Sequence, residues 1–292
     1  MAFNVATFKT RALTAVIFVV IMLAGLLFNQ WSFFILFSII HFGCWVEYQK
    51  LVAIIDPGYA TISRTHKYGV MLAGWCVMLY FASDSLSLFG LQLNQLGWWA
   101  GLIFVFILPI MELLFAKEVQ PKNIAHSFFG LIYISLSWGL MIQLRSQSQF
   151  DDGIFKADLG WIFPVVLIAS IWINDTMAYI VGSFIGKTPF SKISPKKTWE
   201  GTVGGAILAI VVVTLVWLWI FPGSEWYHIS IIAAIAAVFG TAGDLLESKL
   251  KRLANVKDSG SIMPGHGGFL DRFDSLLLAT PFVWLYVVLV IR

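Results

Sequence analysis

The sequence predicts an all-α integral membrane protein, and three observations support that fold class. Of the 292 residues, 59% are hydrophobic and only 12% are charged, against about 25% in a soluble globular domain. So few charges cannot cover the surface of a water-soluble protein of this size. Long apolar runs recur along the chain, and continuous rather than alternating runs indicate helices and not a barrel. The 13 Trp and 25 Phe residues suit lipid and the membrane interface.

About nine apolar runs approach the roughly 20 residues that a helix needs to cross the hydrocarbon core. In chain order they lie near residues 12–28, 31–47, 69–82, 97–115, 126–144, 161–181, 203–221, 228–246 and 273–291. The third run is short. The first run is long and lacks a small-residue cleavage site, so we expect a membrane helix there and not a cleaved signal peptide.

The positions of Lys and Arg predict the orientation of these helices. With the N-terminus inside, all of the 19 Lys and Arg residues fall in inside segments except Arg145, Lys156 and Arg292. We therefore expect a cytoplasmic N-terminus, an outside C-terminus and a location in the cytoplasmic (inner) membrane. The net charge of +3 is small and gives no reason to expect nucleic acid as a partner. Cys44 and Cys76 lie in apolar runs and are expected to be buried, reduced thiols.

Loop composition changes along the chain. Up to about residue 158 the loops are ordinary, whereas later loops are rich in Gly, Lys, Asp and Ser. We expect an N-terminal scaffold half (1–158) and a C-terminal catalytic half (159–292), packed as one unit.

The most informative polar stretch, residues 248–274, joins the last two apolar runs on the expected cytoplasmic side. Asp244 lies just before it, with no evident partner within its own helix, and Asp271 and Asp274 lie at its far end. Carboxylates at membrane depth are costly and usually mark function. Paired carboxylates that leave positions for water suit Mg²⁺, which holds nucleotide phosphates.

The same stretch carries cations and glycines that suit a polyphosphate. The cations are Lys249, Lys251, Arg252, Lys257 and Arg272, and the turn Pro264-Gly-His266-Gly267-Gly268 offers backbone N–H groups to a phosphate. A plainer interpretation stays open, because basic residues after a membrane helix also act as topology signals.

A second polar stretch runs from Asn174 to residue 201. Asn174 and Asp175 stand within an apolar run, which is again an expensive placement. Residues 182–188 are one residue short of a Walker A loop and follow no predicted strand, so we reject a P-loop. Thr198 also fits as the N-cap of the next helix, with Glu200 two residues later.

These two stretches resemble the signature of the phosphatidate cytidylyltransferases, the CDP-diacylglycerol synthases. The resemblance covers roughly residues 170–275. It rests on Ser248-x-Leu-Lys251-Arg252, Lys257-Asp258, His266-Gly267-Gly268, Asp271-Arg272-x-Asp274, Asn174-Asp175-x-x-Ala-Tyr and Ser194-Pro-Lys196-Lys197-Thr-x-Glu-Gly.

The resemblance implies that CTP and phosphatidic acid, drawn from the lipid bilayer, react to CDP-diacylglycerol and pyrophosphate with Mg²⁺, of which we expect more than one ion. It implies metal binding by Asp244 and Asp271, with Asp274 and Asp175 as second-tier ligands. The catalytic set is expected to be Asp244, Asp271, Lys257, Asp258, His266 and Arg272. The substrate-binding set is expected to be Asn174, Asp175, Lys187, Ser194, Lys196, Lys197, Ser248, Lys251, Arg252, Gly267 and Gly268. A homodimer is a further expectation.

Two other functions stay open at this point. A CTP-dependent polyprenol or lipid kinase would transfer the γ-phosphate to an alcohol and would need a base to activate the hydroxyl. An ion-coupled transporter would use intramembrane Asp residues as an ion relay, although the polar residues cluster in one half only.

Overall fold

The computed structural model describes residues 5–115, 119–147, 159–261 and 267–291, with side chains from residue 13 to residue 146 and again from residue 159 within these ranges. In this part of the chain nearly all regular structure is helical. The exceptions are a hairpin of β1 (Ser87–Leu88) and β2 (Leu91–Gln92) and an isolated bridge between Pro189 and Thr198. The all-α prediction is confirmed.

The helices follow the predicted apolar runs. They are α1 (Val5–Leu27), α2 (Gln30–Ile55), α3 (Pro57–Ala60), α4 (Arg64–Tyr80), α5 (Leu93–Phe115), α6 (Pro121–Gly130), the π-helical η1 (Leu131–Leu136), α7 (Ser137–Gln147), α8 (Ile162–Ile185), α9 (Trp199–Ile220), α10 (Trp226–Leu253), α11 (Leu270–Tyr286) and the π-helical η2 (Val287–Ile291). Within the described residues, 7 helical segments are long and apolar enough to cross a membrane. The protein is therefore an integral membrane protein. The first and third predicted runs fall on α1 and α4, which are not among these segments.

The chain divides into two compact units. The first unit is Met1–Gln143 with Leu253–Arg272, and the second is Leu144–Arg252 with Phe273–Arg292. Each unit thus draws on distant parts of the sequence, because the segment after α10 returns to the first unit and α11 continues into the second.

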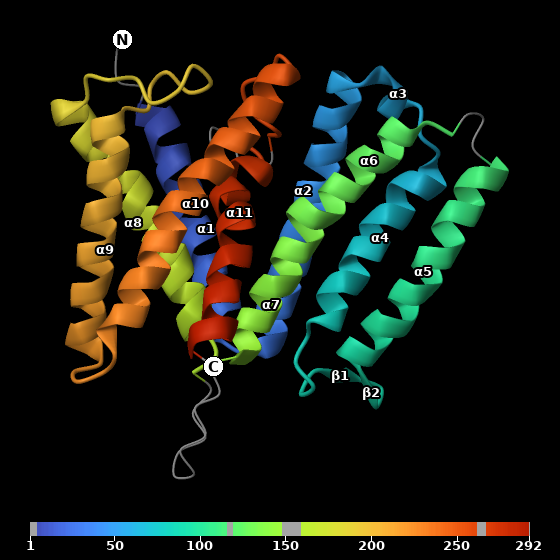
Figure 1. Cartoon of the computed structure of the whole chain (residues 1–292), viewed down its shortest axis with the longest axis horizontal. Helices are drawn as coiled ribbons and strands as arrows, with labels where there is room; N and C mark the ends of the chain where they lie inside the picture. Colours follow the sequence, from blue (N-terminus) through green and yellow to red (C-terminus); the bar gives the residue numbers. More distant parts are fainter. Residues whose placement is uncertain (1–4, 116–118, 148–158, 262–266, 292) are drawn as a thin grey trace. The chain divides into compact units, whose positions relative to one another are not determined.

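In the first unit, α2 is the central element and packs against α1, α3, α4, α6 and η1. Figure 1 shows α4 and α5 running side by side, in agreement with their extensive contact. Aromatic side chains fill the interior, and Phe37, Trp45 and Trp138 are fully buried. The Trp45 indole donates to the buried Ser135 hydroxyl at 2.8 Å, so the polar edge of this ring is satisfied. Cys44 and Cys76 are buried and form no disulfide, as predicted.

In the second unit, small residues let helices approach closely. A Cβ atom added at Gly205 of α9 would lie 2.6 Å from the Ala178 nitrogen of α8, so only glycine fits. Such small-residue contacts are typical of helix packing in membranes. α10 and α11 are joined by the stacked rings of Phe239 and Phe282, 3.5 Å apart, and by a 2.8 Å hydrogen bond between His228 Nδ1 and the Tyr286 hydroxyl.

Candidate active site

Three carboxylates predicted from the sequence gather in the second unit. Asp175 comes from α8, Asp244 from α10 and Asp274 from α11. The approach of α10 to α11 is close, since a Cβ at Gly243 would lie 2.5 Å from the Asp274 carbonyl oxygen. Asp274 is buried, and it interacts electrostatically with Asp244 and Asp175. Three neighbouring carboxyl groups on apolar helices require compensating positive charge when they are ionised.

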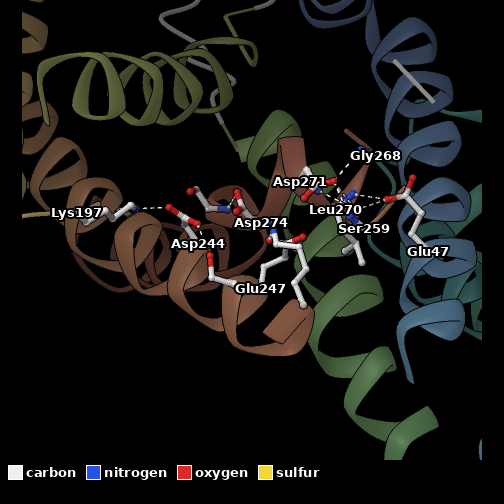
Figure 2. A network of polar contacts seen from close by, with 12 residues as sticks. Glu47, Lys197, Asp244, Glu247, Ser259, Gly268, Leu270, Asp271 and Asp274 are labelled. Atoms are coloured by element: carbon white, nitrogen blue, oxygen red, sulfur yellow. Dashed lines mark hydrogen bonds and ion pairs between the residues drawn. The ribbon is translucent and has the colours of Figure 1, made fainter. Parts of the chain in front are cut away.

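Lys197 supplies part of that charge. Its ammonium forms an ion pair with Asp244 Oδ2, drawn as a dashed line in Figure 2, and it also interacts electrostatically with Asp175. The other oxygen of Asp244 accepts a hydrogen bond from Ser248 Oγ at 3.2 Å. The prediction that Asp244 lacks a partner within its own helix was therefore wrong, because Ser248 lies one helical turn further along α10.

The segment between α8 and α9 is held in a defined shape. The Glu200 carboxylate accepts hydrogen bonds from the backbone N–H groups of Lys187, at 3.2 Å, and Thr188, at 3.1 Å, and from the Thr188 hydroxyl at 2.8 Å. Thr198 caps α9 by accepting from Gly201 N at 3.2 Å, which confirms the predicted N-cap. These contacts shape the segment that carries the predicted phosphate-binding residues. Of these, Lys187 and Lys196 are exposed, and Ser194 and Lys197 are half-buried.

The two predicted cations in the last turn of α10 have different surroundings. Lys251 forms an ion pair with Glu247, one turn earlier, whose side chain is fully buried. Arg252 is exposed. Glu247 was not singled out from the sequence, although its spacing of four residues from Lys251 was a readable signal. Asn174, also predicted, is buried on α8, and its amide nitrogen lies 3.5 Å from Asp175 Oδ1.

In the first unit, one carboxylate oxygen of Asp271 accepts hydrogen bonds from other residues of the predicted stretch 248–274. Its Oδ2 accepts hydrogen bonds from Ser259 N at 2.8 Å, Ser259 Oγ at 2.9 Å and Gly268 N at 2.8 Å. Gly267 has a positive φ of 85°, and a Cβ there would lie 2.6 Å from the same oxygen. Glycine is therefore required at this position by the backbone and by the carboxylate together.

A further carboxylate of the first unit, Glu47 of α2, was missed by the sequence analysis. It is buried and accepts hydrogen bonds from Ser259 Oγ, Phe269 N and Leu270 N (Figure 2). The signal that could have found it is the one used for Asp244, a carboxylate in an apolar run. The other predicted residues of the signature, Lys257, Asp258 and Arg272, are exposed, and His266 lies outside the described residues.

The carboxylates of the second unit match the chemistry of a magnesium site. Asp175, Asp244 and Asp274 offer oxygen ligands, which Mg²⁺ prefers. Among the residues that the structure describes, however, no group of three or more His, Cys, Asp or Glu side chains is close enough to hold a metal ion. Asp271 Oδ2 already accepts the three protein hydrogen bonds described above. The oxygen donors fit Mg²⁺ by their chemistry alone, and its binding here is a proposal.

Comparison with known proteins gives a consistent picture. A family model described as "Cytidylyltransferase family" matches residues 9–290. Phosphatidate cytidylyltransferase from Bacillus subtilis (strain 168) is 40% identical over 159 residues, which are 54% of this chain and 56% of that protein. The protein of the same name from Staphylococcus saprophyticus is 29% identical over 279 residues, 94% of this chain and 96% of that protein. Phosphatidate cytidylyltransferase 4, chloroplastic, from Arabidopsis thaliana is 31% identical, over 62% of this chain and 50% of that protein. The matches to the first and third of these relatives thus span about half of their length.

Proposed function

Because this chain belongs to the cytidylyltransferase family, we propose that it is a phosphatidate cytidylyltransferase, which makes CDP-diacylglycerol and pyrophosphate from CTP and phosphatidic acid. The observation that carries the proposal is the family match over residues 9–290, supported by the relative of that name aligned over 94% of the chain. The signature residues that the resemblance rests on lie within the matched region.

The proposed reaction needs little covalent chemistry from the protein. A phosphate oxygen of phosphatidic acid attacks the α-phosphorus of CTP, a new P–O bond forms, and the bond from the α-phosphorus to the pyrophosphate oxygen breaks. The attacking phosphate is already an anion, so a protein base is not obligatory. Positioning of the two substrates and neutralisation of their charge should dominate the rate enhancement.

Each predicted residue then has a proposed task. Lys187, Lys196 and Lys197, together with the cations of the signature, bind the triphosphate and the lipid phosphate. Asp175, Asp244, Asp271 and Asp274 are the proposed Mg²⁺ ligands. When bound, Mg²⁺ supplies positive charge that neutralises phosphate oxygens. The ion pair of Lys197 with Asp244 supports a place for positive charge beside this carboxylate.

The proposed topology has nine crossings, with the N-terminus in the cytoplasm, the C-terminus outside and the nucleotide bound from the cytoplasmic side of the inner membrane. α1 and α4, which are not among the seven segments described above, complete the nine crossings. The distribution of Lys and Arg supports this orientation, although Lys156 and Arg292, two of its three outside residues, fall beyond the described residues. A scaffold role for residues 1–158, a catalytic role for 159–292 and a homodimer are likewise proposals.

An isotope experiment tests the function. Purified protein is incubated with phosphatidic acid, two lipid alcohols (a polyprenol and diacylglycerol), Mg²⁺ and CTP labelled in either the α- or the γ-phosphate. We expect the α-label in the lipid product and the γ-label in pyrophosphate. A γ-labelled lipid would establish a lipid kinase instead, and transfer of neither label would refute both enzymes and leave the transporter. The Asp244→Asn variant, purified in parallel, shows whether a contaminant produces the signal.

A further inference from the structure

We propose that Glu47 is a positioning residue for the reaction: its carboxylate holds the backbone around Ser259 and the start of α11 in place, and so fixes Asp271. This inference rests on the proposed function for its kinetic consequences, but its structural part can be tested without activity. It also gives a task to the N-terminal part of the chain, in which the sequence analysis found no motif.

The contacts of Glu47 are those of a helix cap supplied from a different helix. Oε1 accepts from Phe269 N at 2.9 Å, and Oε2 accepts from Leu270 N at 2.9 Å. Leu270 is the first residue of α11, so these N–H groups belong to the helix start, where intrahelical partners are lacking. A carboxylate is well suited to this place, because it accepts several hydrogen bonds and its charge favours the N-terminal end of the helix dipole.

Glycines on α2 and in the segment around Ser259 and Phe269 show how closely the two pack against each other. A Cβ added at Gly260 would lie 2.6 Å from Glu47 Cδ, and one at Gly268 would also collide with the Glu47 carboxylate. On α2 itself, one turn before Glu47, a Cβ at Gly43 would lie 2.5 Å from the Phe269 ring. Gly43 and Glu47 therefore form one face of α2, on which the ring and the backbone N–H of Phe269 are both seated.

Ser259 links Glu47 directly to Asp271. Its hydroxyl lies 2.8 Å from Glu47 Oε2 and 2.9 Å from Asp271 Oδ2, and its backbone N–H also donates to Asp271. The hydroxyl has a single proton and can donate to one carboxylate at a time. Asp271 therefore depends on a serine whose own position is held by Glu47, and a displaced Ser259 would displace the proposed metal ligand.

The expected kinetic effect follows from this chain of contacts. Glu47→Ala leaves the part-buried N–H of Phe269 and the buried N–H of Leu270 without their acceptor, which is an unfavourable state that the segment will relieve by moving. A misplacement of about 1 Å can lower a rate by about a hundredfold. We expect kcat to fall at least about tenfold with a smaller change in the KM for CTP, because Glu47 itself touches no substrate. Glu47→Gln keeps one acceptor oxygen, so its kcat should lie between those of Glu47→Ala and the wild type.

The matched control is Gln49→Ala. Gln49 is a buried polar residue on the same helix, and its side chain donates to the Lys67 carbonyl at 2.9 Å, away from the signature. If loss of any buried polar group on α2 were sufficient, this variant would lose kcat as Glu47→Ala does. We expect it to retain kcat within about threefold, since its contact does not reach residues 254–271.

Hydrogen–deuterium exchange of the purified full-length protein gives a readout that does not need activity. In Glu47→Ala, peptides covering residues 254–261 and 267–271 should exchange faster, whereas α4 and α5 should be unchanged. Unchanged exchange at the signature together with normal kcat would overturn the proposal. Faster exchange without any cytidylyl transfer by the wild type would support the positioning contact and refute the proposed function, so the two failures are distinguishable.

A steric double-mutant cycle keeps the proposal testable if Glu47→Ala does not fold. Gly260→Ala should accelerate exchange and lower kcat on its own, because its methyl group collides with Glu47. In the Glu47→Gln background the same methyl group meets a side chain of similar size, so the effect of Gly260→Ala should be unchanged. The shorter side chain of Glu47→Asp leaves space for the methyl group, so in that background Gly260→Ala should have a smaller effect on exchange and on kcat. Equal effects of Gly260→Ala in all three backgrounds would show that the two residues are independent and would refute the contact.

Discussion

Replacing Asp244 by Asn separates catalysis from folding in the second unit. Asn keeps the size of the side chain and an oxygen that accepts the hydrogen bond from Ser248. It removes the negative charge that pairs with Lys197 and that a Mg²⁺ ion requires. We therefore expect a folded variant that has lost most of its turnover.

The cost to stability can be bounded from the exposure of the pair. The side chains of Lys197 and Asp244 are 28% and 27% exposed, between exposed pairs worth about 0.2–1 kcal/mol and buried pairs whose disruption costs about 3–5 kcal/mol. Lys197 keeps its interaction with Asp175 in the variant. We therefore expect the free energy of unfolding to fall by only about 1–2 kcal/mol, or about 2–8 °C in melting temperature. The kcat should fall at least about a hundredfold, as when a stabilising charge is removed from a reaction centre.

The assay measures CDP-diacylglycerol formation and thermal unfolding on the same detergent preparation at saturating Mg²⁺. Glu225→Gln is the control, because Glu225 is a mostly exposed carboxylate of the second unit that pairs with His228 at 3.3 Å. Near-normal turnover of folded Asp244→Asn would refute its assignment as a metal ligand. A variant that does not fold would refute the estimate that the pair contributes only 1–2 kcal/mol.

Three other predictions follow from the structure. Glu200→Gln should raise the KM for CTP several-fold and lower kcat by less, because it loosens the Lys187–Thr188 turn. A CTP titration measures this, with Glu225→Gln as the control, and an unchanged KM would contradict it. Gly205→Ala should lower the free energy of unfolding by about 1–3 kcal/mol by forcing α8 from α9, whereas Gly101→Ala, whose Cβ would lie 3.7 Å from its neighbour, should melt like the wild type; equal melting of both variants would argue against close packing. Single cysteines at the exposed Ser261 and Ser87 should react with impermeant reagents only from the cytoplasmic and the outer side, respectively, over a low background from the buried Cys44 and Cys76; the opposite pattern would invert the proposed topology.

The fold was readable from the sequence to the extent that it depends on local pattern. Apolar runs located the helices because a membrane helix must be apolar along its whole length. Thr198 was recognisable as a cap because capping is decided by residues within one turn. The hydrogen bond from Ser248 to Asp244 has the same local origin, and attention to the i,i+4 spacing would have found it.

The partners of Glu47 could not be predicted from the sequence, for a different reason. Its partners lie 212 to 223 residues further along the chain, so no local window contains both sides of the contact. A glutamate at the end of an apolar run can also lie at the membrane interface. The sequence alone does not say whether the carboxylate at residue 47 or the one at residue 244 has a buried partner. The placement of Glu47 at the start of α11 is a property of the packed first unit alone.

The glycines of the signature show the same limit more sharply. From the sequence, Gly267 and Gly268 are expected to admit a phosphate, since a missing side chain permits close approach. The structure shows close approach by protein carboxylates, with Asp271 against Gly267 and Glu47 against Gly260 and Gly268, and the phosphate contact stays a prediction. Both interpretations use the same missing Cβ atom, and a sequence cannot reveal which group fills its place. Glycines beside these two carboxylates are therefore needed to build the site whether or not any of them also contacts the substrate, and their substitution should perturb Asp271 first.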